Sequence, residues 1–141
     1  MTQSKYGNLV KKMKAQKGPG GADAKQLISM SGDDLEGSNL NFQMGLYSEV
    51  GPWQTGKGAQ MHPYNKCMVF FGHNTDDLSY LGAEITVEIG KEHEKHTFDV
   101  PTVISLPRGT PHFPVVCTKV ERAYRVMQVG LAAEVKTSWI E

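Results

Sequence analysis

The sequence predicts an all-β domain of the jelly-roll kind, and three features of its pattern carry this prediction. Short segments rich in Val, Ile, Phe and Tyr recur roughly every ten residues, with turn-forming residues between them. Several of these segments alternate apolar and polar residues with period two, as half-buried strands do. No long amphipathic helical pattern follows residue 30. About eight short strands in one domain form a sandwich or a small barrel.

The length of the chain fits one domain with a terminal segment at each end. At 141 residues it can bury a proper core but is too short for two domains. Residues 1–25 carry six lysines against the single acid Asp23 and end in a Gly-Pro cluster, so we interpret them as a solvated arm, with a short helix over 7–16. The expected division is an arm with the first strand at 1–37, a barrel at 38–131 and a C-terminal tail at 132–141.

The expected strands follow one another along the chain with turns between them. In the segment 83–89, Ala83, Ile85, Val87 and Ile89 share one face, and the intervening polar residues share the other. We expect the segment 39–50 to form an edge strand. A strand at a sheet edge has unpaired backbone groups and can pair with another chain. The apolar segments, in order, are 26–30, 39–50, 67–72, 81–90, 96–100, 102–107, 113–120 and 123–131.

Charge and cysteine content narrow the classes of partner and compartment. The chain has 15 basic and 15 acidic residues, which gives no reason to expect nucleic acid or a membrane surface as a partner. No apolar run approaches membrane-spanning length, and the first 25 residues lack the apolar core of a signal peptide. Cys67 and Cys117 form no CxxC pair, so we expect reduced thiols and a cytoplasmic protein.

The segment 101–116, PTVISLPRGTPHFPVV, contains Pro107, Gly109 and His112 as P-x-G-x-x-H directly after an expected strand. A Pro-Gly turn of this kind reverses the chain and aims the imidazole from the start of the next strand. Here the chain resembles the cupin superfamily, in particular small single-domain bacterial cupins. The resemblance implies a cupin-type jelly-roll β-barrel, although Pro101 and Val116 replace the outer glycine and asparagine of that motif. A lipocalin-like barrel is the alternative fold.

The stretch GAQMHPYNKCMVFFG, at 58–72, can be aligned with the first cupin motif. The resemblance places His62 at the second histidine position, Gln60 at the first, and Lys66 at the position of the glutamate. Cupins usually hold Fe, Mn, Ni or Zn by three histidines and a carboxylate. In this chain Gln60 and Lys66 replace two of these four ligands. An ammonium repels a divalent cation, and an amide oxygen binds a transition metal weakly. The departures therefore favour a metal-free state.

A rebuilt divalent transition-metal site is the alternative. His96 shares a face with Phe98 and Val100, and could complete a ligand set of His62, His112, His96 and Gln60. A carboxylate from Glu84 or Glu88, or the thiol of Cys67 on a bulge, are further candidates. His73 and His93 lie among turn residues, where we expect them to be exposed.

Without a metal, the interior still carries reactive groups. His62, Tyr64, Lys66, Met68 and Phe70 alternate onto one face, and a buried lysine must lower its pKa or find an anion. The candidate catalytic residues are His62, His112 and Lys66. The candidate ligand-binding residues are Gln60, Lys66, Tyr64, His96 and Phe70.

Two functions stay open. One is a small cupin that acts on a small polar, anionic metabolite, by metal or acid–base chemistry or by a Schiff base on Lys66. The other is a non-catalytic, metal-free module that binds such a ligand. A third interpretation pairs Lys66 with Glu84, Glu88 or Asp99 and needs no ligand. The resemblance also implies a homodimer in which the N-terminal arm or first strand crosses to the partner subunit.

Overall fold

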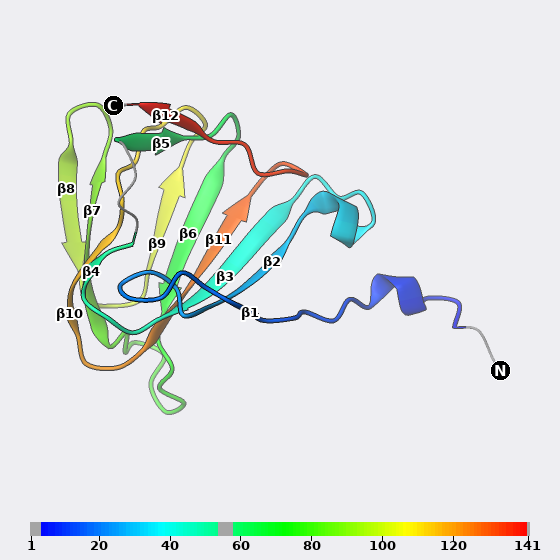
Figure 1. Cartoon of the computed structure of the whole chain (residues 1–141), viewed down its shortest axis with the longest axis horizontal. Coiled ribbons are helices and arrows are strands. Elements are labelled where there is room, and N and C mark those ends of the chain that lie inside the picture. The colour runs from blue at the N-terminus through cyan, green and yellow to red at the C-terminus, as the bar shows by residue number, and fades with distance from the viewer. Residues whose placement is uncertain (1–3, 54–57, 141) are drawn as a thin grey trace.

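In the computed structural model, which describes residues 4–53 and 58–140, the chain forms two antiparallel sheets that face each other (Figure 1). One sheet has the order β1-β2-β3-β11-β6-β9 and the other the order β4-β10-β7-β8, with the pair β12-β5 beside it. The all-β prediction is confirmed. The strands are β1 (Gln16–Lys17), β2 (Gln26–Met30), β3 (Asn41–Tyr47), β4 (Gly51–Pro52), β5 (Ala59–Met61), β6 (Lys66–Phe71), β7 (Ala83–Ile89), β8 (Glu94–Phe98), β9 (Thr102–Leu106), β10 (Val116–Val120), β11 (Tyr124–Gly130) and β12 (Ser138–Ile140).

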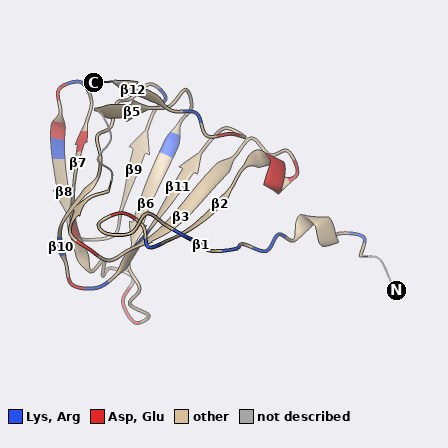
Figure 2. Cartoon of the chain, viewed as in Figure 1, with Lys and Arg blue, Asp and Glu red and all other residues tan. Residues whose placement is uncertain are grey.

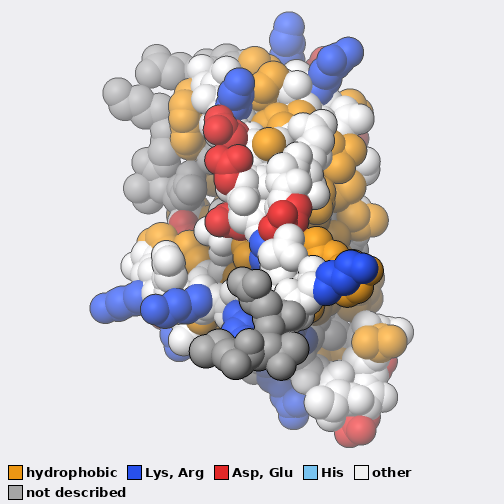
Figure 3. All heavy atoms as spheres, turned by 90° about the vertical axis from the view of Figure 1, so that its right-hand side faces the viewer, with side chains coloured by type: hydrophobic (Ala, Val, Ile, Leu, Met, Phe, Trp, Pro, Cys, Tyr) orange, Lys and Arg blue, Asp and Glu red, His pale blue; other side chains and the backbone are white. Residues whose placement is uncertain are grey.

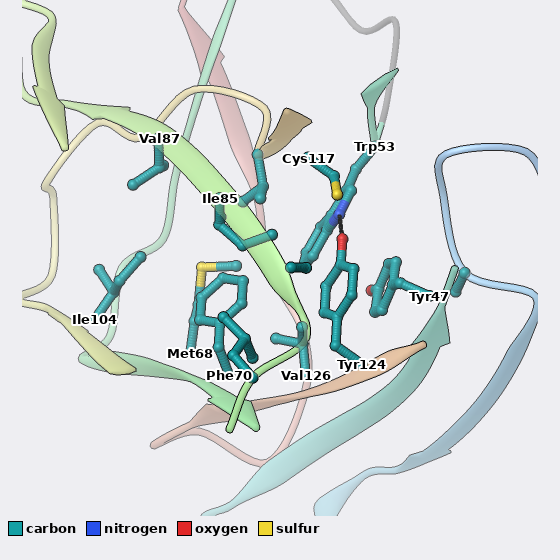
Figure 4. Packing of buried hydrophobic residues seen from close by; sticks show 14 of the residues in the cluster. Tyr47, Trp53, Met68, Phe70, Ile85, Val87, Ile104, Cys117, Tyr124 and Val126 are labelled. Carbon is teal, nitrogen blue, oxygen red and sulfur yellow. Dashed lines mark hydrogen bonds between the residues drawn. The ribbon is translucent and has the colours of Figure 1, made fainter. Parts of the chain in front are cut away.

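The core lies between the two sheets, because the alternating strands point their apolar residues inward from both sides. Phe70 from β6 and Ile85 from β7 are completely buried. The Tyr47 ring stacks on Trp53 with centroids 4.2 Å apart, and Trp53 Nε1 donates to the Tyr124 hydroxyl at 3.2 Å (Figure 4). Aromatic packing thus fills part of the space between the sheets.

The outer face of the six-stranded sheet carries a row of apolar side chains that we call the outer-face row. Strand register places Ile28 opposite Met44, Met44 opposite Met127, Met127 opposite Val69, and Val69 opposite Val103. The first four are half-buried and Val103 is exposed. Seen from one end of the molecule, hydrophobic side chains gather along the right-hand edge of the view in Figure 3. Charged residues lie mainly in the loops and on β7 and β8 (Figure 2).

Three local expectations differ from the structure. The segment 39–50 is not at a sheet edge, because its strand β3 pairs with β2 on one side and with β11 on the other. The helix expected over 7–16 is limited to a single 3-10 turn, η1 (Gly7–Leu9), and a second such turn, η2 (Gly32–Leu35), follows β2. The segment 132–141, expected as a tail, supplies strand β12, which pairs with β5. Within the described ranges, no helix is long and apolar enough to cross a membrane.

Candidate functional site

The turn at Pro107–Thr110 brings the two motif-bearing stretches together. Thr110 N–H donates to the Pro107 carbonyl at 3.1 Å, and Gly109 adopts a φ of +77°, which favours glycine. Gly109 N–H also donates to the carbonyl of His62 at 2.9 Å. The turn is therefore attached to the stretch that follows β5. This bond explains why the proline-glycine turn of one segment fixes the position of a histidine from another.

His112 lies at the junction between β5 and the larger part of the second sheet. Its backbone exchanges two hydrogen bonds with Gln60, at 2.9 and 3.0 Å, and forms a second bridge with Ile89 of β7. The residue is 6% exposed, and the centroid of its ring lies 5.3 Å from that of His62. Backbone pairing thus fixes both imidazoles on rigid elements, side by side.

The ring tautomer of His62 is fixed by its backbone partner. Its Nδ1 lies 2.7 Å from the carbonyl oxygen of Lys136. Because a carbonyl oxygen only accepts, Nδ1 carries the proton and Nε2 presents a lone pair. Burial lowers the pKa of His62, the Lys136 carbonyl raises it, and the charge of Lys66 lowers it further. His62 is therefore a neutral acceptor at neutral pH.

Lys66, the first residue of β6, directs its ammonium toward that acceptor. Its Nζ lies 3.4 Å from His62 Nε2. The ribbon of β6 carries one basic segment, at its Lys66 end (Figure 2). Burial lowers the pKa of Lys66 to about 8, because a charged amine is poorly solvated there. Within residues 4–53 and 58–140, no carboxylate forms an ion pair with it.

The acids considered as partners of Lys66 lie elsewhere. Glu84 accepts a hydrogen bond from Thr118 Oγ1 at 2.7 Å, and Glu88 faces His93 at 3.5 Å. Both are on the outer face of β7, which alternates with the buried Ile85 and Val87. Asp99 is exposed. The interpretation in which Lys66 pairs with one of these acids is therefore wrong.

His112 presents an unpartnered nitrogen. Its Nε2 is buried and has no hydrogen-bond partner among the described residues. Burial, together with the charges of Lys66 and His62, lowers the pKa of His112 to about 3, so the ring is neutral at neutral pH. A buried polar atom without a partner is costly in the folded state. A ligand or a water molecule that donates to, or accepts from, Nε2 would remove that cost.

Lys66 and His112 line one cavity of about 260 Å³. Its walls combine polar and aromatic side chains, which suits a small, oriented ligand. The lining residues are Asp23, Gln43, Tyr47, Trp53, Gln60, Lys66, Met68, His112, Phe113, Pro114, Val115, Gln128, Val135, Thr137 and Trp139.

Two further predicted ligand-binding residues, Tyr64 before β6 and Phe70 on it, are divided between the site and the core. Tyr64 stacks on His62 with centroids 5.2 Å apart and accepts a hydrogen bond from Lys136 N–H at 3.3 Å, so it supports the site. Phe70 has no exposed surface and packs edge-on against Phe98, 5.1 Å between centroids. The expectation that Phe70 contacts a ligand is wrong, because core packing uses the whole ring.

His96 does not join His62 and His112. It lies on β8, at the edge of its sheet, with its side chain 52% exposed and its Nε2 2.8 Å from Glu94 Oε1. The expected triad fails because an edge strand holds its inner-face side chains beside solvent. His73 and His93 are exposed, as expected. Cys67 lies on the outer face, alternating with the buried Met68, and does not reach the site through a bulge.

The residues around the cavity do not fit a divalent transition metal. They supply the imidazoles of His62 and His112 and the amide of Gln60, and they place the ammonium of Lys66 3.4 Å from His62 Nε2. A divalent ion bound beside these imidazoles would be repelled by that ammonium. Among the described residues, no group of three His, Cys, Asp or Glu side chains could hold a metal.

Sequence reasoning missed several residues of the cavity. Gln43 and Gln128 face each other on β3 and β11, and Asp23 comes from the loop between β1 and β2. Gln128 had a readable signal, since it occupies an inward position on β11 in alternation with Tyr124 and Val126. Thr137 and Trp139 belong to the segment expected as a tail.

Comparison with known proteins identifies the fold. No protein-family model matches the chain, and no curated sequence does either. Solved structures of oxalate decarboxylase from Bacillus subtilis do match it. One mutant form has a TM-score of 0.61 at 6% identity, covering 89% of this chain and 30% of that one. A second mutant form has a TM-score of 0.58 at 12% identity, covering 93% and 33%.

A third structure, from a study of the Mn(II) centres of the same enzyme, has a TM-score of 0.56 at 12% identity and covers 88% of this chain and 28% of that one. The chain thus spans about a third of the length of these enzymes. Identities this low bear on the fold alone. The chain therefore has the cupin fold, which its P-x-G-x-x-H segment led us to expect.

Proposed function

We propose that the cavity binds a small anionic metabolite, a carboxylate or a phosphate, without a resident metal. The observation that carries this proposal is the ammonium of Lys66, which lines the cavity with no carboxylate partner in the described part of the chain. A bound anion would supply the missing counter-charge and raise the pKa of Lys66 again. The unpartnered His112 Nε2 beside it offers a hydrogen bond that orients the ligand.

A second candidate function, acid–base catalysis on such a ligand, rests on the pair formed by Lys66 and His62. An amine with a pKa near 8 exchanges its proton readily at neutral pH, and the His62 Nε2 lone pair 3.4 Å away can accept it. The chain would then be a small enzyme rather than a binding module. Turnover of a ligand that binds, and its loss in a His62→Gln variant, would distinguish the enzyme from the module.

The first experiment measures binding directly. Untagged protein is titrated by calorimetry with small carboxylates, including oxalate, and with small phosphate esters. We expect at least one acid to bind, and about tenfold weaker binding or worse in Lys66→Met. Lys95→Met, a change at an exposed residue of β8, is the matched control. Equal affinity in wild type and Lys66→Met would overturn the proposed role of Lys66.

Elemental analysis of the same samples tests the metal-free state. The proposal expects protein without stoichiometric transition metal, in wild type and in His112→Ala alike. Near-stoichiometric Fe, Mn, Ni or Zn that disappears in His112→Ala would favour the metal-dependent alternative.

The two cysteines, Cys67 and Cys117, are free thiols, which supports a reducing, cytoplasmic location.

We also propose that the chain forms a homodimer through its six-stranded sheet. The outer-face row provides a continuous apolar surface across five strands. Residues 4–13 extend away from the sheets (Figure 1) and expose Tyr6, Leu9, Val10 and Met13. An extended arm that exposes apolar side chains buries them by crossing to a second copy.

A further inference from the structure

The loop between β1 and β2 brings a carboxylate into the cavity that Lys66 lines. Gly20 and Gly21 adopt positive φ, +83° and +62°, and Gly20 N–H donates to the Ala24 carbonyl at 2.8 Å. Lys25 N–H then donates to the carbonyl of Leu46 on β3 at 2.7 Å, which attaches the loop to the sheet. Ala24 is completely buried beneath it. Asp23 is therefore held in place by a tight, anchored turn and lines the cavity.

Asp23 is a second charge of the cavity that lacks an ionic partner. Its Oδ1 accepts the N–H of Ala24 at 2.7 Å, and within residues 4–53 and 58–140 no basic side chain forms an ion pair with it. Burial raises the pKa of this carboxyl, and the Ala24 N–H lowers it. A half-buried carboxylate next to polar walls is stabilised by a cationic or donor group in the cavity.

The two charges lie at different ends of the cavity. Lys66 begins β6 and lies beside His62. Asp23 precedes Lys25, whose N–H donates to the carbonyl of Leu46 on β3. Leu46 is level with Phe71, at the opposite end of β6. A ligand that neutralises both must therefore extend from one end to the other.

Strand register gives the length of that ligand. On the inner face of the sheet, Lys66 of β6 lies opposite Gly130 of β11. The next inward position, two residues further along the strands, holds Gln128 of β11 opposite Gln43 of β3. Gly45 is one more step along, and a Cβ there would lie 2.8 Å from the Tyr47 hydroxyl. Two steps span roughly 13 Å at the Cα positions. A hydrogen bond of about 2.9 Å at each end takes up part of this span, which leaves room for a chain of about four to six atoms.

We propose that the ligand is a zwitterion, an ω-amino acid of about four to six carbons, whose carboxylate meets Lys66 and whose ammonium meets Asp23. Gln43 and Gln128 line the wall between the two ends and offer amide groups to substituents along the ligand. This inference rests on the proposed function, because it names the ligand class of the same site. It adds a second, oppositely charged recognition point that a simple anion site would not need.

The test compares three probes that differ by one group each: 5-aminopentanoate, pentanoate and pentylamine. Binding to the full-length protein is measured by calorimetry. We expect 5-aminopentanoate to bind about tenfold more tightly than pentanoate, and Asp23→Asn to abolish that difference while pentanoate still binds. Lys66→Met should weaken both acids. Asn at position 23 keeps the oxygen that accepts the Ala24 N–H, so the loop should fold; Asp33→Asn, in the exposed turn η2, is the matched control.

The outcomes separate this inference from the proposed function. If pentanoate binds and the ammonium group adds nothing, or if Asp23→Asn leaves the preference unchanged, the zwitterion inference is overturned and the anion site stands. If Lys66→Met leaves the binding of both acids unchanged, the anion site itself is overturned. If neither acid binds wild-type protein at millimolar concentration while other carboxylates or phosphates do, the ligand class is wrong. If no anion binds, both proposals fall.

Discussion

At the scale of single residues, Lys66 shows how a binding group lowers the stability of the protein that carries it. Its amine is buried beside two neutral imidazoles, and burial holds its pKa at about 8 against 10.5 in a solvated chain. The unfolded chain therefore binds a proton more readily than the folded chain between these values. The contribution of Lys66 to the free energy of unfolding therefore increases as pH rises from about 8 to 10.5. It is lowest below pH 8, where the folded protein holds a poorly solvated ammonium.

Lys66→Met removes this cost, so we expect the variant to be more stable than wild type at pH 7, by on the order of 1–3 kcal/mol. The advantage should shrink as pH rises from 8 to 10.5, because the wild-type amine is then neutral in the folded protein and the unfolded chain gives up its proton more easily. Urea unfolding at pH 7, 8.5 and 10 measures the difference. A variant that is less stable than wild type at pH 7 would mean that Lys66 has a stabilising partner.

At the scale of strands, close packing around Tyr47 depends on a glycine. A Cβ at Gly45 would lie 2.7–2.9 Å from the Tyr47 ring and hydroxyl, and that ring is held in a stack with Trp53 and Tyr124. Gly45→Ala should therefore destabilise the protein by roughly 1–3 kcal/mol, because the stacked ring cannot move aside without cost. Urea unfolding compares it with Ser29→Ala, a change at an exposed residue of β2. Equal stability of the two variants would show that the ring moves freely.

The strands show which features the sequence can predict. The alternation of apolar and polar residues in 83–89 predicts β7 and the face that it buries, because successive side chains of a strand point to opposite faces of the sheet. The position of 39–50 within the sheet is not predictable in this way, since pairing with β2 and β11 is decided by distant residues. The role of Asp23 is hidden for the same reason. A loop residue reaches a cavity through tertiary packing, which leaves no periodic signal.

At the scale of the whole molecule, the outer-face row leads to a prediction about assembly. Met127 lies at its centre, with Met44 and Val69 as cross-strand neighbours. At micromolar concentration, light scattering should give wild-type protein a mass of about twice that of the 15.6 kDa chain. Met127→Lys should be a monomer, because burying an ammonium in the interface opposes association. Thr97→Lys, on the exposed outer face of β8, should leave the dimer intact. A monomeric wild-type protein would contradict the proposed dimer.

The position of β11 between β3 and β6 has a consequence for how the chain folds. The central strand of the six-stranded sheet is the last of its members along the chain, so β3 and β6 cannot be joined until residues 124–130 arrive. Contacts between distant segments form slowly, and until then two adjacent edges stay unpaired. Refolding should therefore compete with aggregation at high protein concentration. Rapid dilution, rather than slow dialysis, is the condition under which this chain should refold in good yield.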